Sequence, residues 1–92
     1  MLSALPRSLA TVNEADRDKE ILRAGIIAEL DAINFSEQMA ALTKDARIRT
    51  VLLDIAREEK THVGEFQTLL LETDREQASE LREGEREKTG GG

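Results

Sequence analysis

The chain has 92 residues, no cysteine, a formal net charge of −6 and only 2% aromatic residues. A chain of this length makes one small domain that buries too little surface to be robust alone, so we expect it to oligomerise. The lack of cysteine excludes disulfides and thiolate metal sites, and the negative charge argues against a nucleic-acid partner. No stretch approaches the ~20 apolar residues that a membrane span needs, and the N-terminus does not read as a secretion signal. We therefore expect a cytoplasmic protein with no membrane partner.

The first predicted helix begins near Asn13. Residues 1–12 contain the single proline, Pro6, and show no helical period, so they are predicted to form an extended arm. Asn13 suits the N-cap position, and Glu14 and Asp16 place negative charge in the first turn, which favours a helix from here to about residue 42. Its inward seam is predicted to contain Leu22, Ile26, Glu29, Ile33, Ser36 and Ala40, at alternating spacings of four and three.

A second helix is predicted from residue 46 to about residue 72. Thr43, Lys44 and Asp45 interrupt the apolar period, and Asp45 can cap the new helix. So short a connection makes the two helices antiparallel neighbours. Counted from this turn, Gly25 and Gly64 fall nearly level, where they either allow a close approach of the backbones or are tolerated without a role. The inward seam of the second helix is predicted to contain Ile48, Leu52, Ile55, Glu59, His62, Phe66 and Leu69.

A short third helix is predicted from residue 75 to about residue 83. Thr73 and Asp74 offer a capping site before it, and Gly84 is a suitable stop because glycine tolerates the left-handed conformation that commonly ends helices. Residues 84–92 are charged and then glycine-rich, so they are predicted to be a disordered tail or linker. The predicted fold is all-α, with residues 13–83 forming an antiparallel two-helix hairpin plus a short C-terminal helix.

Three potential metal ligands, Glu29, Glu59 and His62, lie on the predicted apolar seams. A buried carboxylate is costly unless it is paired, hydrogen-bonded or bound to a metal. Glu29 and Glu59 are equally far from Lys44, so they are expected to face each other, with His62 one turn further along the same face. The three side chains are therefore predicted to form one cluster.

The cluster matches half of a known ligand set. Carboxylate-bridged di-iron bundles use a Glu from each of two helices and a Glu-x-x-His from each of the other two. Here Glu29 is the single Glu, and Glu59-Lys-Thr-His62 is the Glu-x-x-His. Two hairpins about a two-fold axis would complete four helices and all six ligands. This predicts a homodimer that shares one di-iron (Fe) centre between two chains, with coordination positions left open for redox chemistry.

Each residue also has a simpler interpretation. Glu59 lies in a charged run with Arg57 and Lys60, which is typical of a solvated helix face. His62 can be a core or interface histidine whose ring nitrogens form hydrogen bonds within the protein. Glu29 can pair with a basic residue across an interface. Two other functions stay open: a non-enzymatic helical-hairpin oligomerisation module whose polar seam residues set the register, or a non-redox divalent-metal-binding protein, for example for zinc.

Two runs of the sequence resemble the encapsulated ferritins, which are half-size ferritin-like proteins housed inside encapsulin shells. The runs are Glu-Leu-Asp-Ala-Ile-Asn-Phe, from Glu29, and Asp-Ile-Ala-Arg-Glu-Glu-Lys-Thr-His-Val-Gly-Glu-Phe, from Asp54, and the resemblance covers about residues 20–75. It implies that Glu29, Glu59 and His62 are ferroxidase ligands that oxidise Fe(II) to Fe(III). It also implies a ferritin-like four-helix bundle formed by dimers, a ring-shaped decamer, and an encapsulin shell protein as partner, with iron stored inside a cytoplasmic encapsulin nanocompartment.

The sequence departs from this family at several positions. Several relatives carry a tyrosine beside the centre where this chain has Ser36, and an acidic pair at the mouth of the site where it has Ala28 and Asp31. The family also carries a shell-targeting peptide after the helices, or continues into the shell protein itself. The three glycines at residues 90–92 are accordingly expected to be a truncated linker to a longer product.

Overall fold

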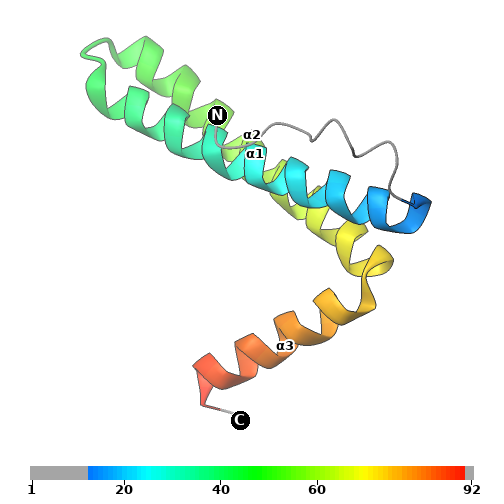
Figure 1. Cartoon of the computed structure of the whole chain (residues 1–92). Helices are drawn as coiled ribbons and strands as arrows, with labels where there is room; N and C mark the ends of the chain where they lie inside the picture. The colour runs from blue at the N-terminus through cyan, green and yellow to red at the C-terminus, as the bar shows by residue number, and fades with distance from the viewer. Residues whose placement is uncertain (1–12, 91–92) are drawn as a thin grey trace.

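Three helices make up the fold. The computed structural model describes residues 13–90 and contains α1 (Glu14–Leu42), α2 (Ala46–Thr73) and α3 (Arg75–Thr89). The helices α1 and α2 run antiparallel, side by side, while α3 leaves this hairpin at an angle and packs mainly against the end of α2 (Figure 1). The predicted all-α hairpin with a C-terminal helix is confirmed. The arm predicted for residues 1–12 lies outside the described residues.

Each helix begins at a polar side chain that caps it. The side chain of Asn13 accepts a hydrogen bond from the amide of Asp16, and Asp45 accepts one from the amide two residues further on. Asp74 accepts a 3.0 Å hydrogen bond from the amide of Gln77. The capping oxygens satisfy amides that have no partner within the helix, which explains why the predicted helix starts agree closely with the structure.

The C-terminal end of α1 is stabilised by a residue of α2. No basic residue lies in the last turn of α1. Instead, Arg49 reaches back from α2, where its Nε donates to the carbonyl oxygen of Ala40 at 3.3 Å and its Nη2 donates to that of Thr43 at 2.8 Å. A positive charge at this helix end also complements the helix dipole, so one side chain holds the turn of the hairpin together.

The third helix extends further than the sequence predicts. It continues through Gly84 to Thr89 and ends at Gly90, whose φ of +78° is left-handed. The sequence predicted this left-handed helix stop at Gly84 instead. Glutamate and arginine around Gly84 favour helix, and an ion pair between Glu83 and Arg86 spans the glycine. The prediction of a disordered tail from residue 84 is therefore wrong as far as Thr89, because local helix propensity outweighs the cost of one glycine.

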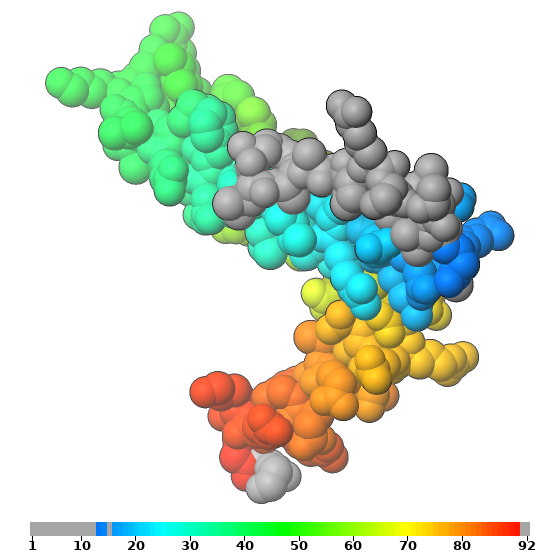
Figure 2. Space-filling view, in the orientation of Figure 1, coloured from blue at the N-terminus to red at the C-terminus, as the bar shows by residue number. Residues whose placement is uncertain are grey.

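The molecule is a thin layer with a small core. Its dimensions are 46 × 41 × 18 Å, and α3 projects away from the hairpin (Figure 2). The buried apolar residues among those described are Ile33, Ala40, Ala56 and Leu70, whereas eleven large apolar side chains are exposed. A single layer of helices cannot enclose its apolar residues, so this fold leaves a large apolar surface uncovered.

The inward face of α2 differs from the predicted seam. Ile55 and Leu69 are 41% and 51% exposed, whereas Ala56 and Leu70, each one residue further along, are buried. A straight helix has 3.6 residues per turn and drifts against a seven-residue repeat, and the small side chain of Ala56 lets α1 approach closely. Ile48, Ile55, His62 and Leu69 of the predicted seam therefore do not face α1, and they lie on a neighbouring side of α2 that is exposed in the single chain.

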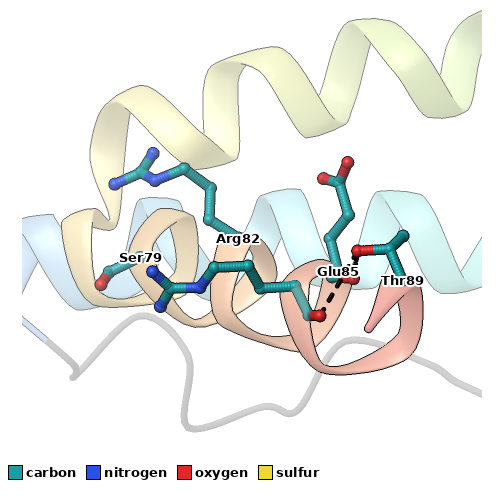
Figure 3. A pocket seen from close by; sticks show the side chains of 5 residues that line it. Ser79, Arg82, Glu85 and Thr89 are labelled. Atoms are coloured by element: carbon teal, nitrogen blue, oxygen red, sulfur yellow. Dashed lines mark hydrogen bonds between the residues drawn. The ribbon is translucent and has the colours of Figure 1, made fainter. Parts of the chain in front are cut away.

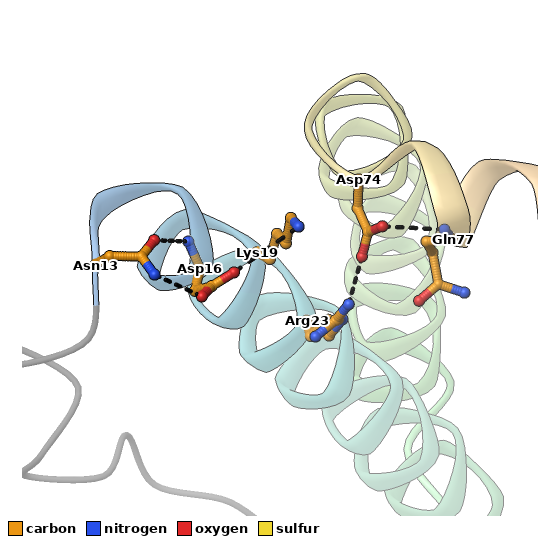
Figure 4. A network of polar contacts seen from close by, with 6 residues as sticks. All are labelled: Asn13, Asp16, Lys19, Arg23, Asp74 and Gln77. Atoms are coloured by element: carbon orange, nitrogen blue, oxygen red, sulfur yellow. Dashed lines mark hydrogen bonds and ion pairs between the residues drawn. The ribbon is translucent and has the colours of Figure 1, made fainter.

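An ion pair fixes the junction between the hairpin and α3. Asp74 is buried, and its Oδ2 lies 2.5 Å from Nη2 of Arg23 on α1, while its other oxygen caps α3 (Figure 4). The hydrogen bond from the amide of Gln77 lowers the pKa of the Asp74 carboxyl against the opposing effect of burial, and Lys19 and Arg23 lower this pKa further. The carboxylate therefore sets the position of α3 while it is ionised.

Candidate metal centre

Two of the predicted ligands meet across the hairpin. His62 Nδ1 on α2 lies 3.4 Å from Glu29 Oε2 on α1. The Glu29 side chain is 22% exposed and that of His62 is 47% exposed, so the pair lies at the edge of the helix interface with one side open. A carboxylate and an imidazole placed in this way can share a proton or a metal ion.

The third predicted ligand, Glu59, is held by a different residue. Its Oε1 accepts a 3.0 Å hydrogen bond from the hydroxyl of Ser36 on α1. Ser36 is only 5% exposed, and Glu59 is half-buried. Glu59 and His62 are three residues apart on α2, which places them on neighbouring positions of one helix face. The resemblance already placed Ser36 beside the centre, but its hydrogen bond to Glu59 was not predicted.

The register of the hairpin differs from the predicted one. Glu29 pairs with His62 rather than lying level with Glu59, which instead lies level with Ser36. The ion pair between Lys60 and Glu37 joins the two helices nearer the turn. All three pairs are centred beyond Lys44, at different points between residues 45 and 49, because long side chains reach along the helices to their partners. The relative height of two helices depends on their packing and not on the turn alone.

The two glycines near this region have different surroundings. A Cβ atom at Gly25 would lie 3.0 to 3.1 Å from three carbons of the Phe66 ring, whereas nothing lies within 4 Å of the equivalent position at Gly64. Gly25 therefore lets an aromatic ring of α2 lie against the backbone of α1, one turn from Glu29. Of the two alternatives, Gly64 fits a glycine without a packing role, whereas Gly25 makes room for a side chain rather than for the backbone of α2.

The predicted ligands lie beside an exposed apolar stripe. In residues 13–90 no three His, Asp or Glu side chains converge closely enough to hold a metal ion, so one chain brings its ligands together only in part. His62 lies at heptad spacing between Ile55 and Leu69, and the stripe continues through Val51 and Ile48. At the tip of the hairpin, Leu42, which is 81% exposed, lines the same hollow as Ile48.

Other features of the surface lie apart from these ligands. A hollow along α3 is lined by Ser79, Arg82, Glu85, Arg86 and Thr89, all from one helix (Figure 3). It contains none of the predicted ligands. Within the described part of the chain, no helix is long and apolar enough to cross a membrane.

The fold and these side chains define a ferritin-like helical hairpin with carboxylate and imidazole groups at its helix interface. Known proteins agree with this class. The crystal structure of the encapsulated ferritin domain from Pyrococcus furiosus matches with a TM-score of 0.78 and 49% identity, covering 98% of this chain and 97% of that chain. The chain belongs to the encapsulated ferritin family.

A curated relative is considerably longer. The chain is 63% identical, over 65 residues, to the ferritin-like–encapsulin shell fusion protein of Pyrococcus furiosus. This match covers 71% of the chain and 19% of that protein, so the chain spans about a fifth of the length of the relative. No family model matches the sequence.

Proposed function

We propose that the chain is one half of a ferroxidase, which oxidises Fe(II) to Fe(III) at a di-iron centre shared between two chains. The observation that carries the proposal is the meeting of Glu29 and His62 at 3.4 Å, with one open side, beside an exposed apolar stripe. The proposed ligands are Glu29, Glu59 and His62 of each chain.

The donor set suits iron. Carboxylate oxygens and imidazole nitrogen are the ligand types of non-haem iron sites, and no thiolate competes for softer metals. Bound iron supplies one-electron redox chemistry. Glu29 and Glu59 contribute two formal negative charges per chain, which offset the charge of the ions and favour the more highly charged oxidised form.

A second copy of the chain is the proposed source of the missing ligands. One hairpin offers two carboxylates and one imidazole, whereas the carboxylate-bridged centre needs twice that number. The stripe around His62 contains Ile48, Val51, Ile55 and Leu69, all at least 41% exposed. A two-fold contact through this stripe would bury it and bring each ligand to its symmetry copy. The same contact would exclude water from the centre and complete a four-helix bundle.

The biological setting is proposed from the relatives. The longer relative joins a ferritin-like part to an encapsulin shell in one polypeptide, so we propose that this chain acts inside an encapsulin nanocompartment and delivers oxidised iron for storage there. A ring-shaped decamer assembled from dimers fits a protein that forms no closed cage of its own.

Anaerobic titration with Fe(II), followed by exposure to air, tests the function. The parent protein is expected to bind about one iron per chain, to consume oxygen as each Fe(II) loses one electron, and to develop ferric absorbance. Glu59→Ala and His62→Ala are expected to abolish oxidation and to retain helicity, because removing a charged or polar group from an apolar seam need not destabilise the fold.

Glu58→Ala is the matched control. Glu58 is an exposed carboxylate adjacent to Glu59, so its loss changes the net charge equally and should leave oxidation intact. Oxidation at the parent rate in both site variants would contradict the assignment of the ligands. Tight metal binding without any oxygen uptake would instead indicate a non-redox divalent-metal-binding protein.

A further inference from the structure

Ser36 is an unusual residue in the interface between α1 and α2. Among the described residues, the buried polar or charged side chains are Ser36 and Asp74. Ser36 lies between the buried residues Ile33 and Ala40 along α1, where a hydroxyl without a partner would be unfavourable. Its partner is Glu59, at 3.0 Å. A buried hydroxyl in an apolar seam is thus satisfied by a proposed metal ligand.

The direction of this hydrogen bond is specific. Hydroxyl groups within helices commonly donate to the carbonyl four residues earlier. Thr50, Thr61, Thr68 and Thr73 all do so in α2. The Ser36 hydroxyl instead donates across the helix interface to Oε1 of Glu59. Because local bonding is available to Ser36 in the same way, the contact to Glu59 is a feature of the packed hairpin.

We infer that Ser36 is a positioning residue for the candidate metal centre, holding the Glu59 carboxylate in its metal-binding orientation before the ion arrives. The inference rests on the proposed function. A carboxylate can accept about four hydrogen bonds, so the Ser36 bond to Oε1 leaves Oε2 free for a cation. The bond can persist when the ion binds.

The other two proposed ligands, Glu29 and His62, are held by each other and not by a separate residue. An ion that enters must therefore replace or share their contact. Glu59 is bound to a residue that is not a ligand, and no such exchange is needed. Glu59 is therefore the pre-oriented ligand of the three. Partners of metal ligands that act in this way typically change metal affinity about 10- to 100-fold when they are removed.

Titration with Co(II) alone tests the inference without requiring oxidation. The visible absorption of bound Co(II) reports both affinity and coordination geometry. Ser36→Ala is expected to weaken Co(II) binding about 10- to 100-fold and to alter the spectrum. Alanine is smaller and favours helix more than serine, so the hairpin should fold. Ser36→Thr keeps the hydroxyl and is expected to bind Co(II) more nearly like the parent protein.

Two further variants separate positioning from a general structural role. Thr68→Ala removes a hydroxyl that donates only within α2 and is expected to leave Co(II) binding unchanged. In a Glu59→Ala background, Ser36→Ala is expected to cause no additional loss, because Ser36 acts through Glu59.

The outcomes distinguish this inference from the proposed function. If the parent protein binds Co(II) and Ser36→Ala binds it equally well, the positioning role is overturned while the metal centre stands. If the losses caused by Ser36→Ala and Glu59→Ala multiply in the double variant, Ser36 acts independently of Glu59 and the inference is also overturned. Failure of the parent protein to bind Co(II) would overturn the centre and the positioning role together.

Discussion

Replacing Gly25 with alanine should destabilise the hairpin relative to the same replacement at Gly64. The added Cβ at position 25 would lie 3.0 Å from Cε1 and Cζ of Phe66 and 3.1 Å from Cε2, whereas ordinary carbon contacts are about 3.5 to 4.0 Å. The ring must therefore move by a few tenths of an ångström. Overpacking of this kind costs about 1 to 3 kcal/mol.

The comparison with Gly64 isolates this cost. Each change from glycine to alanine within a helix favours folding by about 1 kcal/mol, and this gain is common to both variants. At position 64 nothing lies within 4 Å of the new atom, so the gain should appear in full. The free energy of unfolding should thus be about 1 to 3 kcal/mol lower for Gly25→Ala than for Gly64→Ala.

Urea unfolding followed by far-UV circular dichroism measures this difference. Both variants should be compared with the parent at two protein concentrations, so that effects on association are separated from effects on the fold. In a domain of this size, 1 kcal/mol corresponds to a shift of about 4 to 8 °C in Tm. The penalty of Gly25→Ala should largely disappear in a Phe66→Leu background. Equal stabilisation by both glycine replacements would refute the proposed ring contact.

Three further perturbations test other parts of the structure. Arg49→Ala should lower the free energy of unfolding by about 1 kcal/mol, because it removes two hydrogen bonds at the end of α1; Arg47→Ala, at a 92% exposed side chain, should change it little in the same urea experiment. The pKa of Asp74 is lowered from its ordinary value of 3.8, so its contribution is fully present above that value and is lost as the pH falls through the lower folded pKa. Hydrogen exchange should show α3 loosening in acid, and Asp74→Asn should remove this pH dependence. Fe(II) should shift sedimentation towards larger species, since an ion shared between chains binds only the assembled state. His62→Ala should abolish that shift, and Ile55→Lys should weaken assembly with or without iron; unchanged profiles would contradict a shared site.

Sequence reasoning was accurate where the determinants are local. The starts of the helices follow from Asn13, Asp45 and Asp74, whose side chains bond amides two or three residues further on. The short connection at residues 43–45 makes the two long helices antiparallel for steric reasons. The end of α3 was harder to predict, because Gly84 and Gly90 are both suitable stops and only Gly90 adopts the left-handed conformation.

The sequence named the residues of the candidate site but not the contacts between them. Glu29, Glu59 and His62 were identified because polar residues interrupted an apolar period. The partner of each side chain was not predicted, because it depends on how α1 and α2 are aligned along their lengths. The structure pairs Glu29 with His62 and Glu59 with Ser36. Whether these residues bind iron stays a prediction of the proposed function.

The amino-acid sequence by itself determined the three helices, their caps and the residue types available as ligands, because each depends on neighbours within about one helical turn. Only the tertiary structure decided which side of α2 faces α1, at what height the helices meet, and that the Phe66 ring lies against Gly25 while Gly64 stays open. Those choices depend on how small residues such as Ala56 let two helix surfaces interlock, and residues far apart in the chain set that packing together.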